Sequence, residues 1–257
     1  MSHADLTLAA WRTLSDETAH QVAAAIARDT GSELVDGFFE RDGRRFALVP
    51  GGAARVGYDA ARFSPTERQA AHFAAEAAEW GIEESLHDFV DQATSPARAV
   101  VLPALLVAVR SEPAGNLVLD DDGDGDDHAW MTAGLAGRGL RPPTPDEWEF
   151  ACGAGATTLF HWGDDYPDGE PYGDVPLLAQ PNRFGLHIAD DPYRAEFTTD
   201  PQVLCGGDGG SAVCGGYGSF LSWLTLATAY RDTSLPEVVA DGGLTDETPV
   251  RPVIAIP

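Results

Sequence analysis

Thiols are the side chains of this sequence with the widest range of chemistry. The chain has 257 residues and 3 cysteines, Cys152, Cys205 and Cys214. An odd number cannot pair completely within one chain. We therefore expect buried thiols, metal ligands or reactive thiols. Cys152 follows Trp148 and Phe150 on an expected helix, and we expect it to pack in the core.

Cys205 and Cys214 bound a glycine-rich stretch, Cys205-Gly-Gly-Asp-Gly-Gly-Ser-Ala-Val-Cys214. Glycine allows positive φ angles and close backbone approach, so this loop could fold Cys205 back onto Cys214. Two adjacent thiolates would hold a metal ion, or would form a redox-active dithiol. Two separate structural thiols are the third interpretation.

The histidines show no metal-binding spacing. His20, His72 and His87 fall in expected helices, but no two of them are spaced as His-x-x-x-His, which would place both imidazoles on one helix face. We expect His161 and His187 to form hydrogen bonds within loops.

An acidic run, Asp120–Asp127, imitates the start of a calcium-binding EF-hand loop. Position twelve of that loop would be Met131 instead of a bidentate glutamate. The run is therefore interpreted either as a calcium site or as a mobile solvated loop.

The charge excludes some classes of partner. The formal net charge is −25, and all 16 basic residues are arginine. So acidic a chain repels phosphate backbones and anionic membrane surfaces, so we expect no nucleic-acid or membrane partner. There is no run of about 18 apolar residues. The N-terminal residues lack a basic start followed by an apolar segment, so we expect no secretory signal and a cytoplasmic location.

Helices are expected mainly in the first part of the chain. Residues 4–29 are expected to be helical, with Ser15 as a possible N-cap. Ser64-Pro-Thr-Glu67 has the pattern of a capping box before a helix that reaches Trp80 and breaks at Gly81, and a second helix is expected over 83–92. Further on, a helix is expected over 129–138.

Strand and turn signals complete the pattern. Asp42-Gly43 between apolar runs predicts a hairpin, and the apolar run 100–109 predicts one or two buried strands. Thr144-Pro-Asp-Glu147 is a second capping box and opens a helix that carries Trp148. After Gly153 the chain is rich in Gly, Pro and Asp, which predicts short strands and long ordered loops. The expected class is α+β.

A series of segments occurs in a fixed order along the chain. They are Phe46–Gly52, Arg141–Phe150, His161–Asp164, Asn182–Leu186, a degenerate Tyr193–Phe197, Gly209–Ser211, Ala229–Arg231 and Pro249–Val253. In this order they resemble the formylglycine-generating enzymes, also called sulfatase-modifying factors. The resemblance implies a C-type-lectin-like fold, with a small twisted antiparallel sheet and long loops. It implies a family-like domain over 46–257, preceded by an N-terminal helical extension and the start of a hairpin over 1–45.

The resemblance also implies an expected catalytic set. Cys214 follows Gly209-Gly-Ser211 at the spacing of the family's first catalytic cysteine. In that family two thiolates hold copper(I), which activates dioxygen to oxidise a cysteine of a substrate peptide. The second cysteine is Ser219 here, and a hydroxyl is a poor copper(I) ligand. Cys205 is the possible substitute.

Further binding roles are expected near the glycine-rich loop. Tyr217 and Trp223 lie beside it and would bind substrate, although both could be core. Arg231 would also bind substrate, although it could instead pin a loop. The resemblance implies that Asn182 and Glu196 hold a structural calcium ion.

Two functions follow from these expectations. One is a copper-dependent oxidoreductase that acts on a peptide or small molecule through Cys214 and Cys205. The alternative is a non-catalytic lectin-like module that binds a peptide, a small molecule or a partner protein, with aromatic residues such as Tyr217 lining a pocket.

Overall fold

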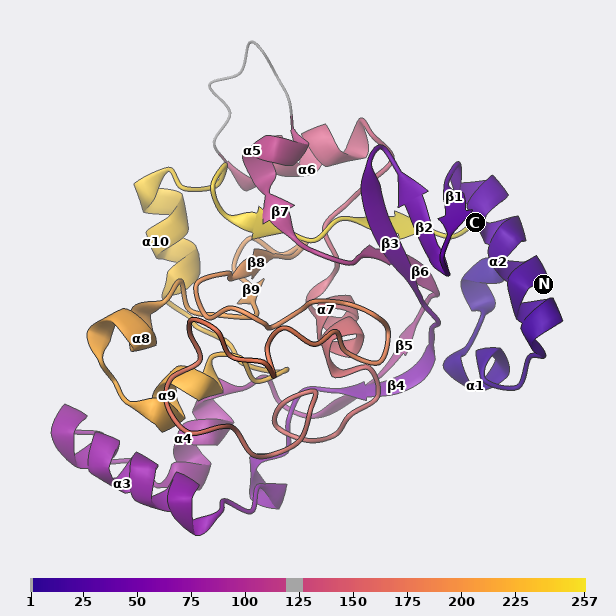
Figure 1. Ribbon diagram of the computed structural model, residues 1–257. Helices are drawn as coiled ribbons and strands as arrows, with labels where there is room; N and C mark the ends of the chain where they lie inside the picture. The colour runs from indigo at the N-terminus through magenta and orange to yellow at the C-terminus, as the bar shows by residue number, and fades with distance from the viewer. Residues whose placement is uncertain (1, 119–126) are drawn as a thin grey trace.

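The computed structural model describes residues 2–118 and 127–257 (Figure 1). Asp120, Asp122 and Asp124, on which the EF-hand interpretation rests, lie outside these residues. The described residues combine helices with small, mainly antiparallel sheets, which confirms the α+β class. No helix among them is long and apolar enough to cross a membrane.

The helices are mostly short and are distributed along the whole chain. They are α1 (Leu8–Trp11), α2 (Asp16–Thr30), α3 (Glu67–Trp80), α4 (Leu86–Ala93), α5 (Ala114–Leu117), α6 (His128–Ala136), α7 (Pro145–Gly153), α8 (Ser211–Gly215), α9 (Ser219–Leu224) and α10 (Leu235–Gly242), with 3-10 turns η1 (His3–Asp5) and η2 (Ala60–Arg62).

The strands are also short. They are β1 (Glu33–Val35), β2 (Phe38–Arg41), β3 (Arg44–Val49), β4 (Gly52–Val56), β5 (Arg98–Leu102), β6 (Leu105–Ala108), β7 (Glu112–Pro113), β8 (Glu196–Phe197), β9 (Leu204–Cys205), β10 (Pro249–Val250) and β11 (Val253–Ala255).

The main sheet has the order β1-β2-β3-β6-β11, with every neighbouring pair antiparallel. The hairpin predicted at Asp42-Gly43 joins β2 to β3, with Arg41 opposite Arg44. A four-stranded sheet has the order β7-β10-β8-β9, and β4 pairs with β5 as a separate ribbon. The run 100–109 thus forms two strands, of which β6 is buried and β5 is only partly covered.

Helix α2 shares a core with the main sheet. Ile26 and Ala27 belong to the same buried cluster as Phe46, Leu106 and Ile254. The boundary expected between residues 45 and 46 falls inside β3, so the N-terminal segment and the residues after it are packed together.

Two predicted helix starts are wrong, for local reasons. Residues 4–29 are not one helix, because Ser15 takes an extended conformation and its side chain accepts a hydrogen bond from Thr18 N, so that α2 begins at Asp16. Helix α3 starts after Thr66, whose side chain accepts from Gln69 N while Gln69 accepts from Thr66 N. The capping box is therefore two residues later than expected. The predicted end at Trp80 and Gly81 is confirmed.

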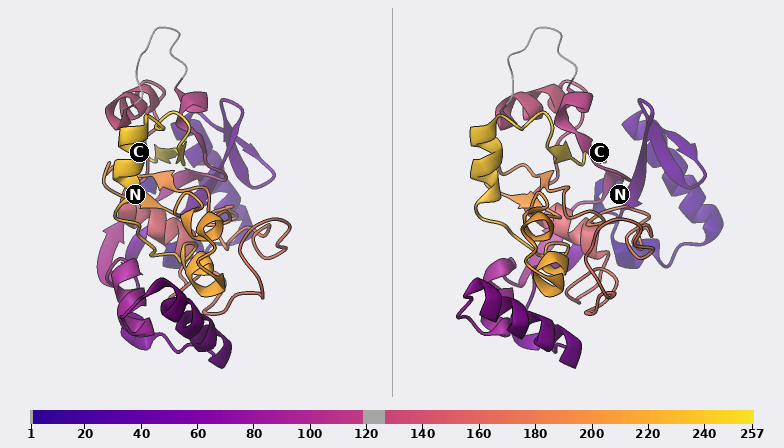
Figure 2. Two further views of the ribbon diagram at one scale, coloured as in Figure 1. Left: turned by 90° about the vertical axis from the view of Figure 1, so that its left-hand side faces the viewer. Right: turned by 60° about the vertical axis from the view of Figure 1, so that its left-hand side comes forward.

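The elements are arranged around α7 (Figure 1). Helices α3 and α4 lie at one end of the molecule and α5 and α6 at the opposite end, as the further views also show (Figure 2). Helices α8 and α9 lie on the side away from α1 and α2. This arrangement brings α4 close to α8 and α9, which come more than a hundred residues later in the sequence.

Candidate functional site

Helix α7 is fixed at its start by a capping box. The Thr144 side chain accepts a hydrogen bond from Glu147 N at 3.2 Å, and Glu147 Oε2 accepts from Thr144 N at 2.8 Å. Consecutive helical side chains point about 100° apart, so Glu147, Trp148 and Glu149 reach three different parts of the chain.

Glu147 and Trp148 anchor two of these parts. Arg141 binds Glu147 with two parallel hydrogen bonds of 2.7 and 2.8 Å. The Trp148 indole N–H donates to Glu196 Oε2 at 2.7 Å. Glu196 also accepts from Arg251 through both oxygens, at 2.9 and 2.6 Å.

Glu149 anchors the third part and is fully buried. Its carboxylate accepts from Gly57 N and Ser95 Oγ, each at 2.6 Å, and also from Arg98 and Arg231. Removing one partner of such a buried, charged network typically costs about 3–5 kcal/mol. Arg231 is thus held against α7, which agrees with its loop-pinning interpretation.

Asn182 and Glu196 do not fit the calcium site expected of them. Asn182 Nδ2 donates to the carbonyls of Ala151 and Cys152 at 2.7 and 3.0 Å. Asn182 Oδ1 accepts from two backbone N–H groups at 3.0 and 3.1 Å. Both Glu196 oxygens are taken by Trp148 and Arg251. Asn182 is therefore bound to the end of α7, and Glu196 is bound to Trp148 of α7 and to Arg251.

The cysteines lie in different surroundings. Cys205 is fully buried in β9 and belongs to the same core cluster as Cys152, as expected for Cys152. Burial raises the pKa of the Cys205 thiol to about 12. Cys214 is exposed on α8, and its sulfur lies 3.4 Å from the Tyr193 hydroxyl.

A metal-binding cysteine must give up its proton, so a thiol with so raised a pKa fits copper(I) poorly. Within residues 2–118 and 127–257, no three His, Cys, Asp or Glu side chains are grouped as metal ligands.

Trp223 and Ser219 also have structural positions. Trp223 is fully buried, and its indole N–H donates to the Gly169 carbonyl at 2.7 Å. It is therefore core, not a ligand-binding surface. Ser219 begins α9, whose first free N–H groups, on Phe220 and Leu221, donate to the Glu76 carboxylate at 3.0 Å each.

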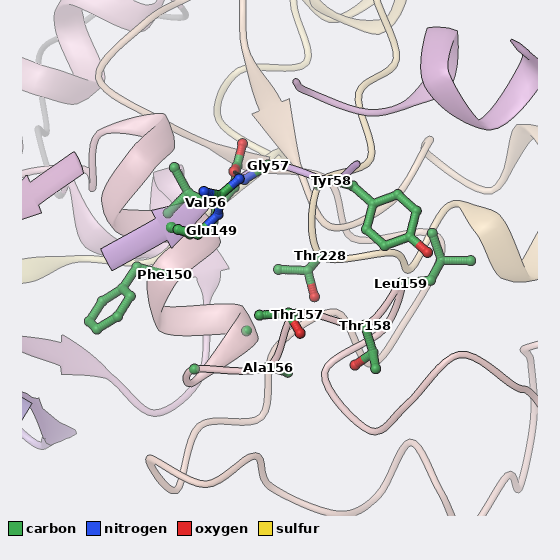
Figure 3. Close-up of a pocket in the computed structure, with 14 residues that line it drawn as sticks. Val56, Gly57, Tyr58, Glu149, Phe150, Ala156, Thr157, Thr158, Leu159 and Thr228 are labelled. Carbon is green, nitrogen blue, oxygen red and sulfur yellow. Dashed lines mark hydrogen bonds between the residues drawn. The ribbon is translucent and has the colours of Figure 1, made fainter. Parts of the chain in front are cut away.

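A small cavity lies beside Glu149 (Figure 3). Thr157, Thr158 and Thr228 lie between α7 and the Tyr58 side chain in this view. The cavity has a volume of about 20 Å³, which leaves room for roughly one water molecule and is too small for a substrate.

A larger pocket lies between α4, α8, α9 and the segment after Ala229. Its volume of about 360 Å³ is in the range of small-ligand sites. We call it the α8–α9 pocket. It is lined by Phe89, Ala93, Asp208, Ser211, Ala212, Tyr217, Leu221, Leu224, Thr225, Tyr230, Arg231, Asp232, Thr233 and Ser234.

The electrostatics of the α8–α9 pocket are set by Asp208 and Asp232. Asp208 is 4% exposed, and its pKa is raised by burial and further by Asp232. The pKa of Tyr230 is also raised, by burial and by both carboxylates. Arg231 is the one cation among the described lining residues, and it is paired with Glu149. The pocket is therefore electronegative.

An exposed aromatic pair lies beside the pocket, and Tyr217 of this pair lines it. Tyr217 is 37% exposed and meets Trp80, which is 45% exposed, edge to face with 4.6 Å between ring centroids. Phe89, Leu221 and Leu224 supply an apolar wall. The pocket thus joins an apolar body to an acidic group of side chains.

Of the predicted site residues, Ser211, Tyr217 and Arg231 line this pocket together, whereas Cys205, Cys214, Ser219 and Trp223 do not. Sequence reasoning missed its acidic members. Asp208 lies before two glycines and Ser211, and its oxygens accept from Gly210 N and Ala212 N. An aspartate before glycines is a usual turn signal and could have indicated this position.

No protein-family model and no curated protein matches this chain.

Proposed function

We propose that this protein is a non-catalytic binding module whose α8–α9 pocket takes a basic group carried by a peptide or small molecule. The observation that carries the proposal is the pair of carboxylates Asp208 and Asp232 in one pocket. The one cation among the described lining residues, Arg231, is already paired with Glu149.

Charge supports a cationic ligand. Asp232 Oδ1 accepts from Ser234 N, Ser234 Oγ and Leu235 N, at 2.8, 2.7 and 3.1 Å. No hydrogen bond to Asp232 Oδ2 occurs within the described residues, so this oxygen is open to an ammonium or guanidinium group. The net charge of −25 adds long-range attraction for a cation.

The shape supports a ligand with an apolar body. A ligand that enters between Phe89 and Leu224 would bury its hydrocarbon part while its charged end reaches Asp232. Tyr217, which lines the pocket, could also hold a cation over its ring face. The Tyr230 hydroxyl has no hydrogen-bond partner within the described residues and can accept from the ligand.

The copper-dependent oxidoreductase has less support. Its second thiolate would have to come from Cys205, which is buried beside Cys152 with its pKa raised to about 12. Cys214 alone supplies one sulfur, and its close neighbour is the Tyr193 hydroxyl.

We also propose that the chain is a divergent relative of the formylglycine-generating enzymes with a C-type-lectin-like fold. The support is the bonding of residues in the similar segments: Arg141, Trp148, Asn182, Glu196 and Arg231 all bind α7 or lie on it. Superposition of these contacts on an experimental structure of a family enzyme tests the assignment.

Binding is tested with phenethylamine as probe, which joins an aromatic ring to an ammonium group. Isothermal titration should show tighter binding than for phenethyl alcohol, its neutral match. Asp232→Asn should weaken phenethylamine by about tenfold, since a hydrogen bond to a charged group contributes about 1.5–3 kcal/mol. Asparagine keeps an oxygen that can accept from Ser234 N, so the fold is retained.

The control is Asp5→Asn, which makes the same charge change at an exposed N-terminal position far from the pocket (Figure 1). It should leave affinity unchanged. Equal affinity for the amine and the alcohol, or equal effects of the two aspartate variants, would contradict the proposal.

A further inference from the structure

A second pocket lies beside the start of β3 and the end of β6 and differs in charge from the rest of the molecule. Its volume is about 380 Å³, and Arg44, Arg45, Arg110 and His187 line it together with Val109 and Glu112. Three of the 16 arginines of a chain of net charge −25 therefore surround one cavity.

The backbone beneath this arginine pocket is rigid. Val109 N donates to the Arg45 carbonyl at 2.9 Å, and His187 N donates to the Val109 carbonyl at 3.0 Å. The buried Arg251 donates to the carbonyls of Ala108, Val109 and His187 at 2.8 to 3.0 Å. The lining side chains therefore project from a backbone that hydrogen bonds hold in place, as a binding site requires.

The three arginines differ in how strongly neighbouring carboxylates bind them. Arg44 is bound by Glu112 through two hydrogen bonds of 2.9 and 3.3 Å and acts as part of the wall. Arg45 makes a weaker contact, with 3.5 Å between its Nε and the Glu40 Oε1. Arg110 is 61% exposed and lies 3.9 Å from Asp190. Arg45 and Arg110 thus keep donors free for a ligand.

His187 completes the set of donors. Its pKa is lowered by burial and then by Arg110 and Arg251, while Asp190 acts in the opposite direction. Its imidazole has no hydrogen-bond partner within the described residues. A neutral imidazole there can donate one hydrogen bond to an anion and gains a proton more readily once an anion is bound.

We propose that the arginine pocket binds the phosphate monoester group of a small molecule, with Arg45, Arg110 and His187 as its donors. Guanidinium groups match phosphate oxygens with paired hydrogen bonds, and their charge does not depend on pH. Three donor side chains can serve the three terminal oxygens of a phosphate dianion, whereas a carboxylate has only two oxygens. This site is separate from the α8–α9 pocket, so it stands or falls independently of the proposed function.

The test follows the imidazole signals of ¹³C-labelled histidine by NMR while inorganic phosphate is added at constant ionic strength. The His187 signal, assigned with His187→Gln, should shift and saturate with a dissociation constant on the order of 1 mM. The pKa of His187 should rise on binding. Acetate in place of phosphate should produce a much smaller shift.

Three variants decide the outcome. Arg45→Gln with Arg110→Gln should weaken phosphate by about tenfold or more. Arg12→Gln, an exposed arginine outside the pocket, should not change it. Asp190→Asn removes the carboxylate that competes for Arg110 and should tighten binding, a gain that misfolding would not produce. The proposal is overturned if the His187 signal does not shift with phosphate, or if acetate shifts it equally. It is also overturned if the double variant of Arg45 and Arg110 binds phosphate as well as the Arg12 variant does.

Discussion

His161 is a partly buried group that ties stability to pH. Its imidazole lies 4.7 Å from the Trp162 ring, centroid to centroid, at an interplanar angle of 81°. Burial lowers its pKa from 6.5 to about 4. The unfolded chain therefore binds a proton on this residue between these two values, while the folded protein does not. Stability is lost in this window as the pH falls.

We predict that His161→Gln reduces this loss. From 6.5 down to about 4, the wild-type protein should lose on the order of 3 kcal/mol through this residue, at about 1.4 kcal/mol per pKa unit. Urea unfolding across this range measures the slope of free energy against pH. The exposed His20 is the control, and His20→Gln should leave the slope as it is. If both variants keep the wild-type slope, His161 is not the group responsible.

At the scale of elements, β9 passes very close to α7. A Cβ added to Gly206 would lie 2.7 Å from Trp148 Cζ2, and one added to Gly207 would lie 2.5 Å from the Pro192 carbonyl oxygen. The same Trp148 side chain binds Glu196 in β8, the neighbour of β9. Gly206 thus lets the chain just after β9 reach α7, and Gly207 lets it reach the backbone at Pro192.

Gly206→Ala should destabilise the protein more than Gly173→Ala does. Both glycines have positive φ, +93° and +80°, so both variants carry a backbone cost of about 1–2 kcal/mol. Gly173 has no atom within 4 Å of the added Cβ, whereas Gly206 meets the Trp148 ring. The difference in unfolding free energy isolates the close approach, and we expect it to exceed about 1 kcal/mol. Equal losses would show that Trp148 moves away without cost.

Local signals predicted some of these elements correctly. The hairpin at Asp42-Gly43 and the capping box at Thr144 depend on residues within four positions of each other, and both are confirmed. Strand β8 has two residues and pairs in parallel with β10, some fifty positions later, which no local pattern indicates. Helices α8 and α9 start directly after Gly210 and Gly218, and α10 ends before Gly243, so the local composition indicates loops where these helices form.

The candidate pocket could be predicted only in part, because it too joins segments that are distant in the sequence. Ser211, Tyr217 and Arg231 could be singled out because they occur in or near the segments that resemble a family. Phe89 reaches the pocket from α4, more than a hundred residues earlier in the chain. Its contribution depends on how α4 packs against α9, which the sequence alone does not indicate.

Net charge acts on the whole molecule. The formal charge of −25 means that carboxylates repel one another across the surface, and a compact state suffers more from this than an extended one. Several surface carboxylates are paired with arginines, but 41 acidic residues exceed 16 basic ones.

Added sodium chloride should therefore stabilise the protein. Raising the salt from about 0.1 M to about 1 M shortens the screening length from roughly 10 to 3 Å, and we expect a gain on the order of 1 kcal/mol in unfolding free energy. Thermal unfolding at several salt concentrations measures it, and potassium chloride should act equally. The same salt should weaken phenethylamine binding at the α8–α9 pocket. A melting temperature that falls with salt would contradict this expectation.

The ion pairs that hold α7 depend on arginine alone. A lysine in place of Arg98, Arg231 or Arg251 would become neutral near pH 10 and release its carboxylate, but a guanidinium keeps its proton well beyond that point. The contacts of Glu149 and Glu196 should therefore survive strongly alkaline solution. The tolerance of the fold to base is then limited by its buried thiols and phenols, such as Cys205 and Tyr230, whose pKa values burial raises, so that rising pH favours the unfolded chain in which they ionise.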